Sequence, residues 1–267
     1  MHNQPEMKAV SVQLYKYLCD EIVGSEKVVR YKRLYCKLHD DLLNNSENAF
    51  IISGSMAEGL TLPGSDIDIM LLDKFCEVYE NRPLHKEDVI ILETENALPG
   101  FALLKKAEEL EFPIKHNFDG TLIACIANSG ILESQCDTED DDDEFFEVHG
   151  PNWSSSLLHD IDMVICVKCQ TWPTVSHKWL CRYRTSGWPS HGIIPNIVSH
   201  GVLLVPVGSK SLNSEGHPFE WRFSFSTSEK LLVYSFNHTQ LPCYSLLKLF
   251  LKEVVDEDNI LNKRLCS

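Results

Sequence analysis

Two aspartates, Asp66 and Asp68, stand at alternate positions of a short segment that we expect to be a β-strand. Side chains at positions i and i+2 of a strand share one face, so the two carboxylates should lie side by side. Like charges at this separation repel each other unless a cation lies between them, and Mg²⁺ prefers carboxylate oxygens as ligands. The pair therefore predicts a site for a divalent metal ion.

A Gly-Ser pair, Gly54 and Ser55, precedes the aspartates by about a dozen residues. It opens a predicted helical turn (54–59) directly after a predicted buried strand (49–53), and a Pro-Gly loop (63–64) follows. Glycine lets the backbone approach a ligand closely, and the amides that open a helical turn carry a partial positive charge. A turn that binds phosphate next to carboxylates that bind a metal ion is the minimum that phosphoryl or nucleotidyl transfer requires.

The same residues also have a purely structural interpretation. Ser55 and Glu58 have the spacing of a capping box, in which the serine caps a helix and the glutamate returns the hydrogen bond. An Asp-x-Asp pair at the rim of a sheet can be merely solvated. Each piece alone leaves both interpretations open, but the combination in this order favours the chemical one.

A third carboxylate, Asp162, stands near the start of a long alternating segment (157–168) that predicts another strand. It would reach the same metal ions as Asp66 and Asp68 if the two strands were neighbours. Periodicity alone does not show whether they are.

Composition limits the class of protein. The 267 residues are 43% hydrophobic and 24% charged, which is typical of a globular protein with one large domain or two small ones. Eight acidic residues lie in the segment 137–147, and without them the net charge of −15 would be −7. Such an acidic run predicts a solvated loop and argues against a surface that binds nucleic acid throughout.

Neither a secretory signal nor an apolar run of membrane-spanning length is visible, so we expect a soluble, cytoplasmic protein without a membrane partner. The ten cysteines are accordingly expected to be reduced thiols.

A basic run lies on a predicted helix that reaches from about residue 25 to 45. Its apolar side is predicted to be Val28, Tyr31, Leu34, Tyr35, Leu38 and Leu42. The basic residues are the candidate nucleic-acid contacts of the chain: Lys27, Arg30, Lys32, Arg33 and Lys37. The alternative is a helix face that is simply exposed.

The remaining pattern predicts a mixed α/β chain. Helices are expected before Gly24 and over 176–184, 227–235, 243–255 and 256–265, and strands over 89–92, 101–104, 121–126 and 201–207. A loop at 208–216 is the best candidate for a domain boundary.

These motifs together resemble the Mab-21 family, which includes cyclic GMP-AMP synthase and the animal cGAS-like receptors. The resemblance rests on Gly54-Ser55, Glu58-Gly59, Asp66-x-Asp68, Asp162, the segment 221–226 and Glu229-Lys230. It implies an α/β (α+β), two-lobed nucleotidyltransferase fold with a central mixed sheet. The nucleotidyltransferase domain would cover residues 1–212, and residues 213–267 would form a partial helical lobe of the HhH/H2TH-like type.

The resemblance also implies roles for individual residues. Asp66, Asp68 and Asp162 would hold two Mg²⁺ or Mn²⁺ ions as catalytic carboxylates. Nucleotide contacts would fall on Gly54, Ser55, Glu58, Arg222, Ser224, Ser226, Glu229, Lys248 and Ser267. Active members join ATP and GTP into a cyclic dinucleotide on sensing double-stranded nucleic acid, and this product activates the receptor called stimulator of interferon genes.

Two departures from the family pattern shape the expectation. Only Cys243 falls on a ligand position of the zinc thumb of cyclic GMP-AMP synthase, so we expect no zinc and an activator that is RNA rather than DNA. The family continues beyond a segment like 263–267 with a base-stacking tyrosine and further helices, so we expect a truncated form of reduced stability and activity. The alternative to an enzyme is a non-catalytic Mab-21 protein that binds nucleotide or nucleic acid as a scaffold.

Overall fold

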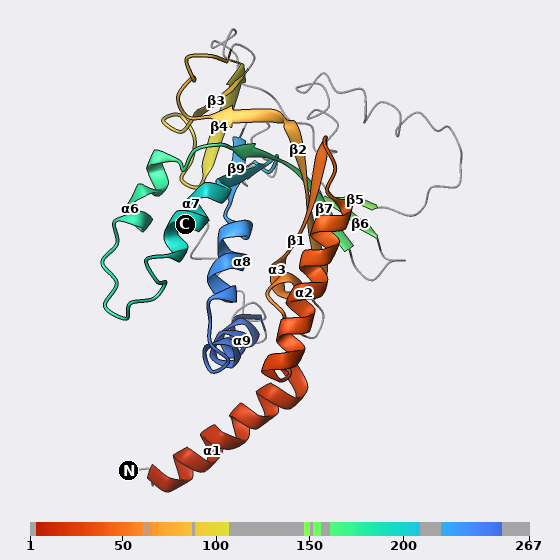
Figure 1. Ribbon diagram of the computed structural model, residues 1–267, viewed down its shortest axis with the longest axis vertical. Helices are drawn as coiled ribbons and strands as arrows, with labels where there is room; N and C mark the ends of the chain where they lie inside the picture. Colours follow the sequence, from red (N-terminus) through yellow and green to blue (C-terminus); the bar gives the residue numbers. More distant parts are fainter. Residues whose placement is uncertain are drawn as a thin grey trace, which may run out of the picture.

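The computed structural model describes residues 4–60, 62, 65–86, 89–106, 147–149, 152–155, 161–208 and 220–252. A mixed sheet forms the body of this part of the chain (Figure 1). Its strands are β1 (Asn48–Ser53), β2 (Ile67–Tyr79), β3 (Ile90–Glu93), β4 (Phe101–Lys106), β5 (Glu147–His149), β6 (Asn152–Ser155), β7 (Ile161–Cys169), β8 (Val202–Val205) and β9 (Glu220–Ser224). The prediction of a mixed α+β fold with a central sheet is confirmed, and the architecture is consistent with a nucleotidyltransferase fold.

The strand order is β1-β2-β3-β4-β9-β8-β7-β6-β5, and β2 pairs with β7 as well. This extra pairing closes a ring that runs from β2 through β3, β4, β9 and β8 to β7. The β2–β3 and β2–β7 pairs are parallel, whereas the other pairs are antiparallel. The long strand β2 can join both parts of the sheet because its register with β7 shifts between Asp73 and Glu77.

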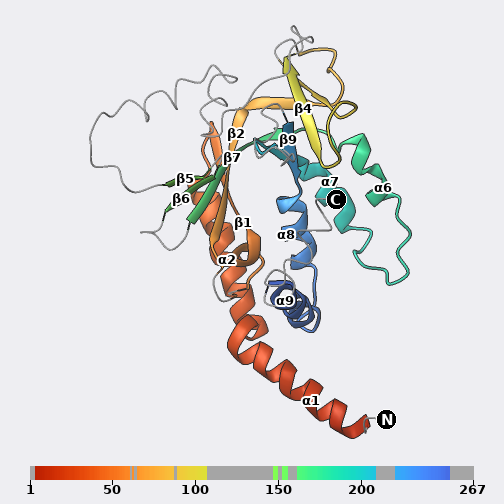
Figure 2. The same cartoon turned by 180° about the vertical axis from the view of Figure 1, so that it is seen from behind.

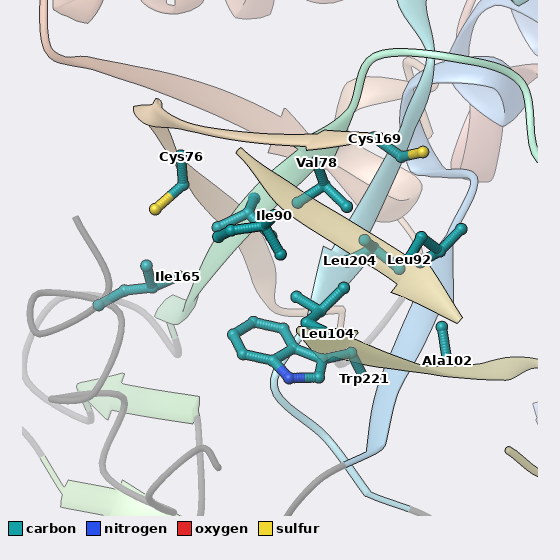
Figure 3. Packing of buried hydrophobic residues seen from close by; sticks show 11 residues of the cluster. Cys76, Val78, Ile90, Leu92, Ala102, Leu104, Ile165, Cys169, Leu204 and Trp221 are labelled. Atoms are coloured by element: carbon teal, nitrogen blue, oxygen red, sulfur yellow. The ribbon is translucent and has the colours of Figure 1, made fainter. Parts of the chain in front are cut away.

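The main hydrophobic core lies inside this ring. Side chains from all six strands point toward one another there, and Trp221, Leu104 and Leu204 are among the most deeply buried (Figure 3). Trp221 belongs to β9, which pairs with β4 on one side and β8 on the other. A strand beyond the predicted boundary at residue 212 is therefore a central member of the same sheet, while the division into two domains stays a prediction.

The helices are α1 (Gln4–Tyr17), which continues as the π-helix η1 (Leu18–Val23), α2 (Glu26–Leu43), α3 (Gly54–Ala57), α6 (His177–Leu180) after the short 3₁₀ turn η2 (Thr174–Ser176), α7 (Ile193–His200), α8 (Ser226–Tyr234) and α9 (Gln240–Phe250). Both views show α1 projecting away from the sheet, while α2 runs alongside β1 (Figures 1 and 2). Gly24 ends the first helical segment with a left-handed φ of 89°, and the Ser25 hydroxyl caps α2 by accepting from the Val28 amide.

The predicted packing side of α2 is wrong. Its six predicted apolar residues are exposed, from 43% at Val28 to 79% at Leu42, whereas Val29 and Cys36 are buried. Val29 packs with η1 and Leu60, and Cys36 packs with Ile52 and Ala57. The helix packs through a narrow row of small side chains because β1 and α3 approach it closely. Periodicity alone predicted burial for the larger apolar side chains, which are exposed.

The other predicted elements mostly agree with the structure. The predicted strands at 89–92, 101–104, 157–168 and 201–207 correspond to β3, β4, β7 and β8, and the predicted helices at 227–235 and 243–255 to α8 and α9. The expected helix at 176–184 is only one turn, α6, and α7 was not predicted. The predictions for 121–126, the loop 208–216 beyond residue 208 and 256–265 lie outside the described residues, as does nearly all of the acidic segment. No helix in the described ranges combines the length and apolarity that crossing a bilayer requires.

Candidate functional site: two aspartates beside the Gly-Ser turn

Asp68 and Asp162 lie side by side on neighbouring strands. Strands β2 and β7 are parallel, and their register pairs Asp68 directly with Asp162. Neighbouring strands are about 4.8 Å apart, and paired residues project from the same face of the sheet. Both aspartates line one cavity of about 260 Å³, here called the acidic cavity, together with Arg222, Ser224 and Ser226. The neighbour relation between the two strands, which the sequence left open, is thus settled.

The Asp68 carboxyl group is electrostatically strained. Its partial burial raises the pKa of Asp68, and the charges of Asp162 and Asp66 raise this pKa further, against the opposing effect of Lys248. A group with such surroundings favours a proton or a cation at the position between the carboxylates. The described residues thus fit a divalent cation chemically, with oxygen ligands of the type that Mg²⁺ and Mn²⁺ prefer.

Asp66 lies just before β2 and is exposed to solvent. Its charge reaches Asp68, as the raised pKa of Asp68 indicates. Within the described ranges, however, no group of three or more His, Cys, Asp or Glu side chains is arranged to hold a metal ion. The structure therefore brings two of the three predicted carboxylates together, and the three-carboxylate metal site stays a prediction.

The Gly-Ser turn lies directly against Asp68. Gly54 has a left-handed φ of 66°, and a Cβ atom at this position would overlap with Oδ2 of Asp68. The missing side chain therefore lets the carboxylate rest against the start of α3, as expected for close approach of a backbone to a charged group. Between strands β1 and β2, the Ser53 hydroxyl donates to the backbone carbonyl of Asp68 at 3.3 Å.

The capping-box interpretation of Ser55 and Glu58 is wrong. Ser53 takes the cap position, without a side-chain hydrogen bond, and Glu58 stands at the C-terminal cap of α3. It accepts from the Tyr244 hydroxyl at 2.8 Å and from the Lys248 ammonium group at 2.5 Å. Lys248 also donates to the Ser55 hydroxyl at 3.2 Å. Helix α9 thus supplies a lysine that joins Ser55 and Glu58, two of the predicted nucleotide contacts.

The predicted nucleotide contacts in β9 and at the start of α8 divide between two cavities. Arg222, Ser224 and Ser226 stand at alternate positions and line the acidic cavity. The hydroxyl of Ser226 donates to the sulfur of Met70 at 2.8 Å and so contacts β2 directly. Glu229 lines a different cavity, and burial and then the charge of Glu58 raise the pKa of Glu229. Ser267 lies outside the described residues.

The basic residues of α2 are not equivalent. Lys27, Arg30 and Lys37 are exposed, but Arg33 and Lys32 are half-buried and engaged in the protein. The Arg33 guanidinium donates to the backbone carbonyls of Glu58, Val233 and Tyr234 at 2.9, 3.1 and 3.5 Å, and Lys32 donates to the carbonyl of Val23 at 3.4 Å. Two of the five predicted nucleic-acid contacts therefore stabilise the fold, because their long side chains reach carbonyl groups behind the helix.

Residues 132–235 match the family model described as the Mab-21 protein nucleotidyltransferase domain. Over this range the chain is similar to the Mab-21 nucleotidyltransferase domain. The matched range includes Asp162, Arg222, Ser224 and Ser226, and seven of the eleven residues that line the acidic cavity belong to it. The match supports a nucleotidyltransferase-type function with nucleotide substrates, and such enzymes generally use divalent metal ions.

Two contributors to the site were missed by sequence reasoning. Tyr244 lies one helical turn before Lys248 and contacts the same carboxylate, so the i, i+4 spacing was an available signal. Arg33 clamps the carbonyl of Glu58 to the end of α8 and stacks over the Tyr234 ring at 4.7 Å. Its role depends on contacts between distant segments, for which the sequence carries no comparable pattern.

Proposed function

We propose that this chain is a metal-dependent nucleotidyltransferase that joins ATP, GTP or both into a cyclic dinucleotide. The observation that carries the proposal is the pairing of Asp68 with Asp162 directly against the glycine of the Gly-Ser turn. A binding protein has no need to hold two carboxylates together at a cost in repulsion, whereas nucleotidyl transfer needs them next to a phosphate cradle.

Each part of the site has a distinct role in this proposal. Asp68 and Asp162, with Asp66 nearby, would hold Mg²⁺ or Mn²⁺, which supplies charge neutralisation and activation of a ribose hydroxyl. The amides that follow Gly54, the Ser55 hydroxyl and the Lys248 ammonium group bind and orient the donor triphosphate. Opposite them, the planar guanidinium of Arg222 and the hydroxyls of Ser224 and Ser226 position the second nucleotide in the acidic cavity.

The exposed basic residues of α2 define the proposed contact with an activating double-stranded RNA. Lys27, Arg30 and Lys37 remain accessible, and exposed tyrosines lie between them at positions 31 and 35. We propose that RNA binding by this face switches on the synthase in the cytoplasm, in the manner of a cGAS-like receptor of innate immunity. The product would then act on a cyclic-dinucleotide receptor of the stimulator of interferon genes type.

The deciding experiment measures pyrophosphate release from ATP and GTP with Mn²⁺ or Mg²⁺, with and without double-stranded RNA, and identifies the product by mass spectrometry. We expect release by the wild-type chain and none by Asp68→Asn or Asp162→Asn. Asp41→Asn, which changes an exposed carboxylate on α2, is the matched control and should leave turnover unchanged.

The alternative function is a non-catalytic scaffold that binds nucleotide, and the absence of a three-acid metal cluster from the described residues favours it. Saturable ATP binding without pyrophosphate release, under all metal and RNA conditions, would establish this alternative and refute the enzyme.

A further inference from the structure

Helix α2 has two apolar sides. Val29 and Cys36 lie on the side that packs against η1, β1 and α3. The opposite side carries six large apolar side chains that are between 43% and 79% exposed, here called the outer row: Val28, Tyr31, Leu34, Tyr35, Leu38 and Leu42. A surface helix normally has one apolar side, so the second one indicates a partner that the described part of the chain does not supply.

The spacing of the outer row is that of a coiled coil. Five of its six members, at positions 28, 31, 35, 38 and 42, follow one another in alternating steps of three and four residues. This is the heptad period of the apolar positions in helices that pair with other helices. Helix α2 is unbroken over 18 residues, long enough for two full heptads. The outer row therefore fits another helix of the same period.

The two tyrosines of the outer row are held in place by their own helix. The ammonium group of Lys27 lies 5.8 Å from the centre of the Tyr31 ring, and the Tyr35 ring lies 4.7 Å from the ring of His39. Tyrosine is enriched at the centre of protein interfaces, and a ring that is already ordered loses little entropy on binding.

The charges beside the outer row favour an antiparallel pair of identical helices. When two copies of α2 lie antiparallel with Tyr31 of each against Tyr35 of the other, the heptad register places Lys27 opposite Asp41 of the second copy, twice by symmetry. Lys32, the charged residue nearest to the symmetry axis, already donates to a backbone carbonyl of its own chain. A parallel pair would match Asp41 with position 46, which lies beyond the end of α2.

We propose that the chain forms a two-fold homodimer through the outer rows of two antiparallel α2 helices. At about 150–200 Å² for a whole side chain of this size, the exposed parts of the outer row amount to about 500 Å² per copy and about 1,000 Å² per pair, the lower limit for a specific interface. Arg30 and Lys37 stand at heptad positions outside this contact and stay accessible in the dimer. The proposal does not depend on whether the chain is a transferase.

Sedimentation equilibrium of the full chain, treated with nuclease and measured at micromolar concentrations, tests the dimer. We expect the mass of two chains for the wild type. Leu38→Glu places an unpaired charge in the contact and should raise the dissociation constant by about tenfold or more. Leu38 is 50% exposed in the single chain, so the variant should fold, which circular dichroism would check. Leu84→Glu changes a leucine outside α2 that is 96% exposed, and as the matched control it should leave the mass unchanged.

A charge exchange tests the antiparallel register. Neutral loss of an exposed ion pair has little effect, so the test reverses the charge. Asp41→Lys sets two lysine pairs against each other and should raise the dissociation constant by about three- to tenfold. Adding Lys27→Asp to the same chain restores the opposite charges and should return the dissociation constant to within about twofold of the wild type.

Four results would overturn the proposal. The first is a wild-type mass of one chain at every concentration, and the second is a dimer that Leu38→Glu leaves intact. The third is a charge exchange that fails to restore the Asp41→Lys variant, because the copies would then pair in another register. The last is a chain that dimerises only after residues 253–267 are deleted, because the chain itself would then cover the outer row. A single-chain mass together with loss of double-stranded RNA binding in Leu38→Glu would assign the outer row to RNA instead.

Discussion

Replacing Asp68 by asparagine should stabilise the metal-free protein at neutral pH. Asp68 and Asp162 are paired on strands about 4.8 Å apart, and two unit charges about 5 Å apart repel by about 3 kcal/mol at an effective dielectric constant of 20. The Asp68 side chain is accessible to solvent, which reduces this figure to about 1 kcal/mol. For a chain of this size we therefore expect a rise in melting temperature of about 2–4 °C.

The effect should depend on pH in a defined direction. The pKa of Asp68 is raised in the folded protein, so its ionisation weakens folding, and this penalty is present above the folded pKa and vanishes below the ordinary aspartate pKa of about 3.9. Asp68→Asn should therefore melt higher than wild type at pH 7 but not near pH 3.

Differential scanning fluorimetry with and without Mn²⁺ measures both effects. Mn²⁺ should raise the melting temperature of the wild type and have much less effect on Asp68→Asn. Asp41→Asn, on the exposed side of α2, should match the wild type throughout. A variant that melts at or below the wild-type temperature at pH 7, or that keeps its advantage at pH 3, would refute the proposed repulsion.

Three further outcomes follow from the contacts. Gly54→Ala should cost about 1–2 kcal/mol of stability from the left-handed backbone alone, and nucleotide turnover should fall because the new Cβ displaces the Asp68 carboxylate. Urea unfolding and pyrophosphate assays at equal protein concentration would detect both effects. Stability equal to that of the wild type would contradict the prediction. Arg33→Leu leaves three carbonyls without their donor and should lower unfolding free energy by about 2–4 kcal/mol, against less than about 0.5 kcal/mol for exposed Arg30→Leu. A maleimide reagent followed by mass spectrometry should label exposed Cys181 rapidly and Cys166 only on unfolding, since burial raises the pKa of the Cys166 thiol; equal rates would disprove that burial.

Local pattern was sufficient for much of the candidate site. The order of buried strand, Gly-Ser turn and Asp-x-Asp strand is visible in consecutive residues, and β1, α3 and β2 form there as predicted. The alternation in β7 likewise placed Asp162 on a definite face of its strand, whereas β9 was not predicted. Such features depend on contacts between near neighbours in sequence, whose period of two the residues themselves display.

Tertiary structure decided which of these faces meet. The parallel register of β2 with β7 brings Asp162 beside Asp68, and the docking of α9 brings Lys248 to Ser55 and Glu58. The same long-range packing chose the buried side of α2 and engaged Arg33 in the interior, against the pattern of large apolar residues. The sequence of a helix or strand shows which of its faces is apolar and which is polar. The segment that packs on a given face is determined by the free energy of packing distant segments together, and the local sequence periodicity does not encode this.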